Sequence, residues 1–238
     1  MVVLGVILVR AGSKGLPGKC MRDLWGRPLI AYTFDHALAA LGLSAVVVST
    51  DSQPAQELAR ASNIEVIDRP AKLATDSATV DAATRHAVEV GEKHHERTVD
   101  AVVLLYGNIP VRADGVIDRA IAKLTESGAD SVRTVAPVSK QHPDWIHRLE
   151  GDRMAQFRPN SIYRRQDLEP LYYHDGAVAA VTRTALFDAL DTPDDHQAFL
   201  GKDRRALVQR SDEAVDVDEA IDLHIAEAIL RAKTETRP

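Results

Sequence analysis

Near its start the chain reads Val2-Val3-Leu4-Gly5-Val6-Ile7-Leu8 and continues directly into Val9-Arg10-Ala11-Gly12-Ser13-Lys14-Gly15-Leu16-Pro17-Gly18-Lys19. The first run is apolar and rich in β-branched residues, which predicts a buried strand over about Val2–Val9. The second combines three glycines with a serine and three cations, so it predicts a loop that approaches an anion closely with its backbone N–H groups. Ligands of open α/β sheets bind at the carboxyl ends of strands, and this loop therefore predicts a polyphosphate site there.

The loop differs from the common phosphate-binding motifs. A Walker A loop has four residues between its glycines and then Lys followed by Ser or Thr, whereas five residues separate Gly12 from Gly18 and no hydroxyl residue follows Lys19. Residues 11–15 faintly resemble the turn that carries a nucleophilic serine, here Ser13. Two lysines beside that serine favour phosphate over an ester. The plain alternative is a glycine-rich turn with solvated lysines.

Downstream, short apolar runs alternate with longer amphipathic segments. The runs predict strands at about 45–49, 64–67, 101–105, 131–138, 175–181 and 206–209, and the segments predict helices at about 28–43, 54–61, 79–96, 115–126, 184–190 and 218–233. Alternation of this kind is typical of an α/β fold with a mainly parallel sheet. We expect a single domain over residues 1–238, with the rhythm interrupted over about 140–173 by a small flap of two short strands.

Composition narrows the function classes. The net charge is −6, which argues against nucleic acid as a partner, and no apolar run reaches the length of a membrane span. A single cysteine excludes a disulfide framework and fits the reducing cytoplasm. An anionic chain that binds an anion must concentrate its cations locally, and Arg10, Lys14 and Lys19 do so in the opening loop.

A second candidate site is Val215-Asp216-Val217-Asp218, directly before the last predicted helix. Carboxylates at i and i+2 of an extended backbone lie on the same side of the chain. They can converge on one Mg²⁺, which prefers carboxylates, waters and phosphate oxygens. Alternatively, Asp218 caps the helix and Asp216 is solvated, a common arrangement for aspartate.

Two stretches give the chain a family resemblance. Arg10-x-Gly12-Ser13-Lys14-Gly15-x-Pro17-Gly18-Lys19, followed by Gly26-x-Pro28-Leu29-Ile30, resembles the opening of the sugar-acid cytidylyltransferases, and most closely the acylneuraminate cytidylyltransferases, or CMP-sialic acid synthetases. The resemblance implies a Rossmann-like three-layer α/β/α nucleotidyltransferase fold. It also implies a homodimer in which the flap reaches the partner's site.

The same resemblance assigns roles to individual residues. The family's nucleotide loop corresponds to Arg10, Gly12, Ser13, Lys14, Gly15 and Lys19, and its metal-holding aspartate pair corresponds to Asp216 and Asp218. The run Asp68-Arg69-Pro70-x-x-Leu73-Ala74-x-Asp76 matches a family run whose arginine reads cytosine, so Arg69 is expected to bind the base; on sequence alone it could equally be a surface residue. Thr79 is adjacent to the position of a nucleotide-binding serine and could replace it.

The acceptor side departs from the family pattern. Tyr106 stands where relatives have a glutamine that contacts the sugar acid, Asp175 where they have asparagine, and Cys20 where they commonly have asparagine. Cys20 is otherwise explained as a small buried residue. Arg164 and Arg165 match flap arginines that contact the partner's substrate carboxylate, although a surface charge run would look alike; His174 flanks the same region.

These residues predict a Mg²⁺-dependent cytidylyltransferase that moves CMP from CTP to a sialic-acid-like sugar acid and releases pyrophosphate. Arg10, Lys14 and Lys19 would neutralise the triphosphate, and Asp216 and Asp218 would hold the metal. Three alternatives stay open: the same transfer to a 3-deoxy-octulosonate or a phosphonate, hydrolysis through Ser13, and nucleotide binding without catalysis. The sequence does not identify the acceptor.

Overall fold

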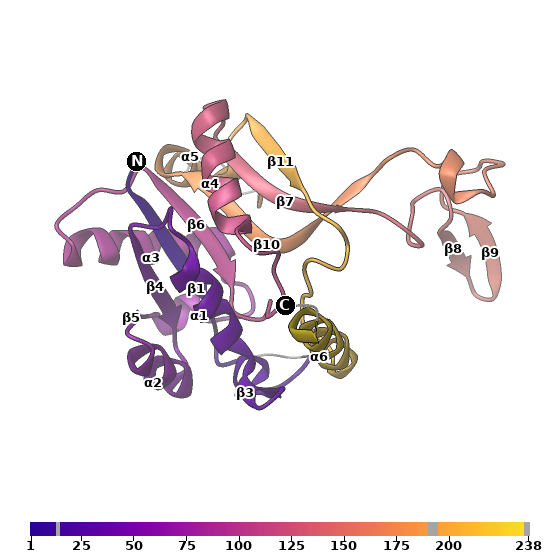
Figure 1. Ribbon diagram of the computed structural model, residues 1–238. Coiled ribbons are helices and arrows are strands. Elements are labelled where there is room, and N and C mark those ends of the chain that lie inside the picture. Colours follow the sequence, from indigo (N-terminus) through magenta and orange to yellow (C-terminus); the bar gives the residue numbers. More distant parts are fainter. Residues whose placement is uncertain (13–14, 190–194, 236–238) are drawn as a thin grey trace.

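A computed structural model describes residues 1–12, 15–189 and 195–235. Its main feature is a seven-stranded sheet of order β11-β7-β10-β6-β1-β4-β5 (Figure 1). The strands are β1 (Val3–Leu8), β4 (Ala45–Thr50), β5 (Glu65–Asp68), β6 (Ala101–Tyr106), β7 (Ser131–Pro137), β10 (Tyr172–Thr182) and β11 (Arg204–Val208). The pairs β1–β4, β1–β6, β4–β5 and β7–β11 are parallel, whereas β10 is antiparallel to both β6 and β7. The predicted mainly parallel α/β sheet is therefore confirmed.

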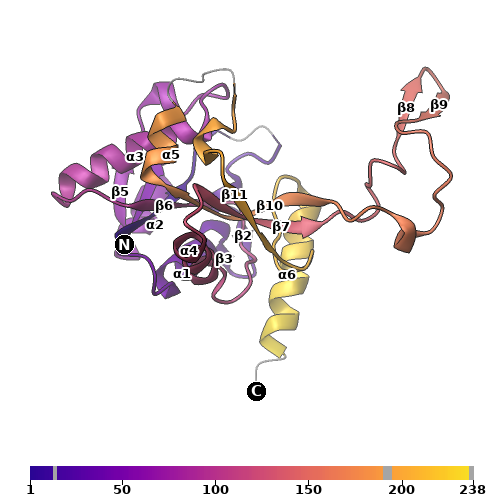
Figure 2. The same cartoon turned by 90° about the horizontal axis from the view of Figure 1, so that it is seen from above.

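Helices cover both faces of this sheet, which gives the expected three layers. Figure 2 shows α3 (Val80–His94) and α5 (Arg183–Asp188) on one side and α1 (Leu29–Ala39) and α4 (Val116–Ser127) on the other. α2 (Gln53–Ala61) packs in the same apolar cluster as α1 and α4. Side chains of β1 alternate between the layers: Val3 and Ile7 join that cluster, while Leu4, Val6 and Leu8 pack with α3 and α5.

Most helices lie within two residues of their predicted bounds, but α1 ends four residues early, at Ala39. The N–H groups of Leu41 and Gly42 donate to the carboxylate of Asp118, at 3.2 and 2.8 Å, instead of continuing the helical ladder. Asp118 lies on α4, so the early end of α1 results from a contact between two helices of the same layer.

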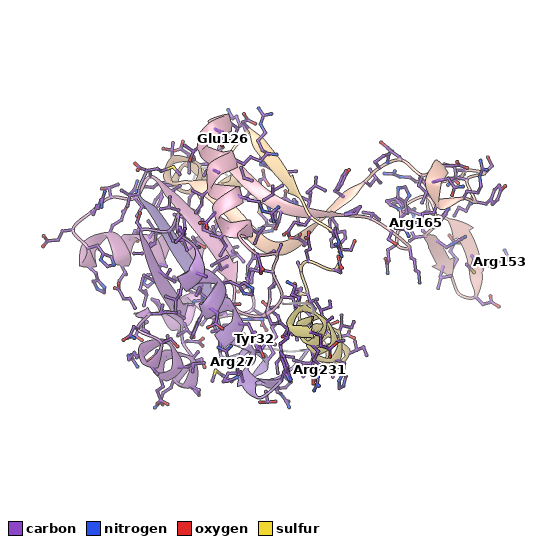
Figure 3. All side chains as sticks on the ribbon, in the orientation of Figure 1. Arg27, Tyr32, Glu126, Arg153, Arg165 and Arg231 are labelled. Carbon is purple, nitrogen blue, oxygen red and sulfur yellow. The ribbon has the colours of Figure 1, made fainter. Side chains whose placement is uncertain are left out.

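The last helix, α6 (Ala220–Glu235), packs outside the three layers on β2 (Asp23–Leu24) and β3 (Arg27–Pro28). Leu16, Leu24, Tyr32, Val217 and Ala226 form part of a separate apolar cluster there. Arg231 lies over the Trp25 ring and Arg27 over the Tyr32 ring, at 5.7 and 5.0 Å from the centroids (Figure 3). An isolated bridge between Val111 and Val215 fixes the segment that enters α6.

Residues 138–171, which we call the arm, leave the body between β7 and β10 and carry the hairpin β8 (His147–Glu150) and β9 (Arg153–Gln156) (Figures 1 and 2). The hairpin residues are all exposed. Contacts at the base of the arm hold it: the Trp145 indole donates to the Ile162 carbonyl at 2.9 Å, and buried His142 contacts the Glu169 carbonyl at 3.0 Å. The two short strands predicted within residues 140–173 are thus present. Across the described ranges, we find no helix long and apolar enough to cross a membrane.

Candidate functional site

A cavity of about 300 Å³ opens beside the carboxyl ends of β1 and β6. The loop after β1, the segment after β5, the start of α3 and the end of β6 line it. Six residues predicted from sequence are among the lining: Arg10, Gly12, Lys19, Arg69, Thr79 and Tyr106. Ser13 and Lys14 lie outside the described residues. The structure therefore gathers five of the six described nucleotide residues around one hollow of the sheet edge, and the sixth, Gly15, is not in the lining.

The loop after β1 is fixed by acidic residues from neighbouring elements. The Ala11 N–H donates to the carboxylate of Asp51 at 2.8 Å, and the Arg10 guanidinium pairs with Asp76 at 2.7 Å. Ser52, and not Asp51, caps the helix that follows β4, where it accepts from the Ala55 N–H. Asp51 serves the loop instead, because the end of β4 lies next to the end of β1 in the sheet.

The loop also meets the segment that precedes α6. Lys19 Nζ lies 2.6 Å from Asp218 Oδ1, and a Cβ built on Gly15 would come within 2.8 Å of the Asp218 backbone oxygen. Gly15 therefore permits a close approach that a larger residue would disturb. The structure brings the predicted cation Lys19 to the predicted carboxylate Asp218, although 199 positions separate them in the chain.

Asn108 connects the carboxylate pair to β6. Its side-chain amide donates to Asp216 Oδ1 and, at 3.3 Å, to the Val217 carbonyl. Its backbone carbonyl accepts from the Val217 N–H at 3.0 Å. Asp222 accepts from the N–H groups of Asp218 and Glu219 at 2.9 and 2.8 Å. Asp222, rather than Asp218, thus caps this turn, so the alternative reading of Asp218 as a helix cap is wrong.

The pair has the donor set that a magnesium ion bound with a phosphate would require. Burial first, and then the like charge of Asp218, raises the pKa of Asp216 to about 6; a cation would relieve that repulsion. Mg²⁺ is commonly held by one or two carboxylates and completes its shell with water and substrate phosphates. Within the described parts of the chain no group of three or more acidic, His or Cys residues forms a self-sufficient metal site, and two carboxylates fit a metal that arrives with its substrate.

Arg69 and Thr79 face the cavity while also making protein contacts. The Arg69 guanidinium donates to the Ser49 hydroxyl at 3.1 Å and to the Ser49 carbonyl at 2.6 Å. Burial lowers the Arg69 pKa, and Asp51 opposes that shift. The Thr79 hydroxyl accepts from the Ala82 N–H at 3.4 Å and caps α3. Both residues are anchored at the cavity wall, as a base-recognition site requires.

Cys20 is buried at the cavity wall. Burial raises its pKa to about 11, against the opposing effect of Lys19. A thiol in that state stays protonated near neutral pH and is a poor nucleophile. Cys20 is thus the small buried residue that the sequence allowed.

The acceptor residues predicted from sequence fall into two separate groups. Tyr106 lies at the cavity end of β6, and burial raises its pKa; His174 is exposed on β10. Arg164 and Arg165 are on the arm, where Arg164 pairs with Asp167 at 2.8 Å, and Figure 3 shows Arg165 well away from the sheet. Within one chain the structure does not bring the arm arginines to Tyr106.

Asp175 and Arg112 are structural. Asp175 is buried and accepts from the Thr134 hydroxyl, the Ala177 N–H and the Gln209 amide. Arg112 is fully buried and donates to the carbonyls of Tyr106, Ile109 and Ala177 and to the Thr33 hydroxyl. Burial lowers the Arg112 pKa to about 9, with Asp175 opposing the shift. These groups fix the loop that carries Asn108.

Sequence reasoning missed Asn108 and the loop-fixing role of Asp51. Asn108 lies three positions after the predicted strand 101–105, in the loop at the carboxyl end of that strand where ligands bind, and that position was the available signal. Asp51 is in the equivalent position after β4. Their partners, Asp216 and Ala11, lie 108 and 40 positions away, so no local pattern connects them.

Comparison with known proteins agrees with this geometry. The family model described as Cytidylyltransferase matches residues 4–198. The chain is 34% identical over 177 residues to an N-acylneuraminate cytidylyltransferase of Streptococcus agalactiae serotype V, covering 73% of this chain and 41% of that protein. It is 29% identical over 243 residues to a CMP-N,N'-diacetyllegionaminic acid synthase of Legionella pneumophila, covering 99% of each chain.

A solved structure of CMP:2-keto-3-deoxy-manno-octonic acid synthetase complexed with CTP superposes with a TM-score of 0.73 at 20% identity, covering 98% of this chain and all of that one. That likeness supports the fold. The chain spans about two fifths of the length of the streptococcal relatives. The family match covers most of the chain but stops before Asp216 and Asp218. By this match and these relatives, the chain belongs to the cytidylyltransferase family, within its sugar-acid cytidylyltransferases.

Proposed function

We propose that this protein transfers CMP from CTP to a sialic-acid-like sugar acid and releases pyrophosphate, with Mg²⁺ as its cofactor. The observation that carries the proposal is the contact between Asp218 and Lys19, a residue of the glycine-rich loop that lines the cavity. It joins a cationic phosphate loop to a carboxylate pair, the two charge types that handling a metal–triphosphate requires. The Legionella relative of nearly equal length is named for making a CMP-sugar acid.

In this proposal each described residue has a physical task. Arg69, anchored on Ser49, would bind the cytosine, and Arg10 and Lys19 would neutralise the phosphates. Asp216 and Asp218 would hold Mg²⁺, which neutralises phosphate charge when bound. The acceptor hydroxyl would attack the α-phosphorus in line, breaking its bond to the bridging oxygen of pyrophosphate. Because no protein group forms a covalent bond, the rate gain comes from positioning and charge stabilisation.

The acceptor would enter beside Tyr106. A phenol offers one hydroxyl and an aromatic face, whereas an amide offers two donors and an acceptor, so this chain would contact its sugar differently from relatives with glutamine there. Sugar acids are the first choice of acceptor because the named relatives act on them. A 3-deoxy-octulosonate is the second, since a 3-deoxy-manno-octulosonate cytidylyltransferase of Bdellovibrio bacteriovorus is 31% identical over 142 residues.

We further propose that the protein acts as a homodimer through the arm. Exposed apolar side chains gather on this projection: Ile146, Leu149, Met154, Phe157 and Tyr163. A projecting apolar surface favours association, and an isologous pair would bring each arm toward its partner's cavity. Arg165, which lies away from its own sheet (Figure 3), and the preceding residue Arg164 would then approach the partner's acceptor. A single buried cysteine and the use of CTP support a cytoplasmic site of action.

The test is pyrophosphate release from CTP across a panel of sugar acids, a 3-deoxy-octulosonate and phosphonates, with Mg²⁺ and with EDTA. We expect Mg²⁺-dependent release with at least one sugar acid. Release only with a phosphonate would support the alternative acceptor. A metal-independent burst with an activated ester would indicate hydrolysis, and CTP binding without release for any acceptor would indicate a nucleotide-binding protein.

A further inference from the structure

Arg133 is a half-buried cation with no task in the reaction proposed above. It lies on β7 next to Val132, whose side chain packs in the cluster beneath α1 and α4. Successive side chains of a strand point to opposite faces, so Arg133 points to the other face. Leu104 and Tyr106 of β6 pack on that same face. Arg133 and the cavity-lining Tyr106 thus share one side of the sheet.

Small residues flank Arg133 in the sheet. Ala179 of β10 lies between Arg133 and Leu104 of β6, and Ala206 of β11 is its neighbour on the other side. A methyl group on each side leaves room for a long side chain above the sheet. The Arg133 guanidinium can therefore extend along the face instead of being packed in place by its neighbours.

The strand register places Arg133 between two predicted acceptor residues. Tyr106 lies two residues beyond Leu104 on β6, and His174 of β10 pairs with Val135, two residues beyond Arg133. Cross-strand partners share a face, so His174 lies on the face of Arg133. The register of β10 shifts between His174 and Ala179.

The charge of Arg133 acts on both neighbours. Burial lowers the His174 pKa and Arg133 lowers it further, while Arg133 opposes the rise that burial causes in the Tyr106 pKa. Burial lowers the pKa of Arg133 itself, with Tyr106 and then Asp175 opposing. The Asp175 oxygens are taken by other donors. The Arg133 guanidinium makes no hydrogen bond or ion pair with any residue in the described ranges, so it is a partly desolvated donor beside the site.

We propose that Arg133, from the same chain that supplies the nucleotide cavity, binds the carboxylate of the acceptor in addition to any arm arginine that a dimer would bring; this inference rests on the proposed function. Arg10 and Lys19 lie on the β1 side of Tyr106, whereas Arg133 lies on its β7 side. Phosphates would occupy the first side and leave the second for the acceptor. A guanidinium matches a carboxylate with two parallel N–H donors, and Tyr106 and His174 would border the sugar ring.

The test compares Arg133→Met with the matched variant Arg205→Met. Arg205 of β11 pairs with Val132 and so lies on the opposite face, where it forms an ion pair with Asp203. We expect Arg133→Met to raise the acceptor KM about 10- to 100-fold, the effect of one lost charge-assisted contact. The CTP KM and the thermal midpoint should stay close to the Arg205→Met values. Arg133→Lys keeps the charge but lacks the paired N–H donors of a guanidinium, so its acceptor KM should fall between those of Arg133→Met and wild type.

A second measurement uses the same sugar as its acid and as its carboxamide. Wild type should prefer the acid, and Arg133→Met should lose most of that preference. If the Arg133 variants keep the wild-type preference and acceptor KM, Arg133 does not bind the carboxylate and the inference is overturned while the proposed function stands. If wild type fails to release pyrophosphate with every acceptor in the panel, the proposed function fails and this inference falls with it.

Discussion

Replacing Asp218 with asparagine should separate catalysis from stability. The carboxylate pairs with Lys19, but the Asp218 side chain is 68% exposed, and an ion pair so open to water contributes about 0–1 kcal/mol to folding. Asn keeps the shape and one oxygen, and the backbone N–H of residue 218 keeps its acceptor on Asp222. We therefore expect an unfolding free energy within about 1 kcal/mol of wild type.

Turnover should respond far more strongly. The substitution removes one of two charged metal ligands, and loss of one electrostatic stabiliser costs about a hundredfold in turnover, or about 2.7 kcal/mol. The assay is initial-rate pyrophosphate release at saturating CTP and acceptor, repeated over a Mg²⁺ titration. The Mg²⁺ concentration for half-maximal rate should rise, while CTP binding should weaken less than turnover.

Asp222→Asn is the matched control. It removes a carboxylate from the same turn, yet an amide oxygen can still accept from the N–H groups of Asp218 and Glu219. Its turnover should stay within about fivefold of wild type, as expected for the loss of a nearby screened charge. Asp218→Asn turnover matching that of the control, with an unchanged Mg²⁺ requirement, would refute the metal assignment.

Three further outcomes are expected. Wild type should prefer CTP over UTP by at least about tenfold, because a site whose hydrogen-bonding groups match cytosine leaves some of them unpaired with uracil. Arg69→Ala should lose that preference. Equal use of both nucleotides by wild type would contradict base recognition by Arg69. Burial lowers the pKa of His36 to about 4, so this side chain binds a proton more weakly in the folded state than in the unfolded state. The contribution of neutral His36 to the free energy of unfolding is therefore complete above pH 6.5 and is lost as the pH falls toward 4. In urea titrations, the free energy of unfolding of wild type should fall by about 3 kcal/mol over that pH window, and that of His36→Gln should fall by less. Parallel curves of stability against pH for the two proteins would rule out this role of His36. Finally, mixing Arg165→Ala with Asp218→Asn chains should restore activity, since one of the two sites in a mixed dimer is intact; no recovery in demonstrated heterodimers would exclude a shared site.

Local patterns predicted the elements of this fold well. The apolar run at residues 2–9 and the glycines after it mark a strand and its loop without reference to distant residues, and β1 with its loop follows them closely. The direction of β10 was not predictable in this way, because an apolar run such as Asp175–Val181 reads alike in either direction. The end of α1 was missed for a related reason: Asp118, 76 positions from Gly42, determines it.

In the candidate site, too, some features follow from local sequence and others from contacts with distant residues. Chemical type indicated the loop cations, whereas the Asp216–Asp218 pair was predicted as a metal site only with the family resemblance, since aspartate before a helix is also a common cap. Contacts between separate segments decided the rest. Nothing near Asn108 in the sequence indicates that its amide holds Asp216, and the buried hydrogen bonds of Asp175 depend on Gln209 of a segment 34 positions later. Arg133 looked like a strand residue of no special role until the register placed it beside Tyr106.

The 199 positions between Lys19 and Asp218 also set a delay between the synthesis of these two residues. A ribosome adds about 5–20 residues per second, so roughly 10–40 s pass between synthesis of the cationic loop and synthesis of its carboxylate partner. Closing a loop of that length costs entropy that only a formed sheet can offset. During those seconds the nascent chain can assemble the cavity walls from the loop after β1, the segment after β5, the start of α3 and the end of β6, while Asp216 and Asp218 are still to be made. The walls of the cavity can therefore form before the proposed metal ligands exist.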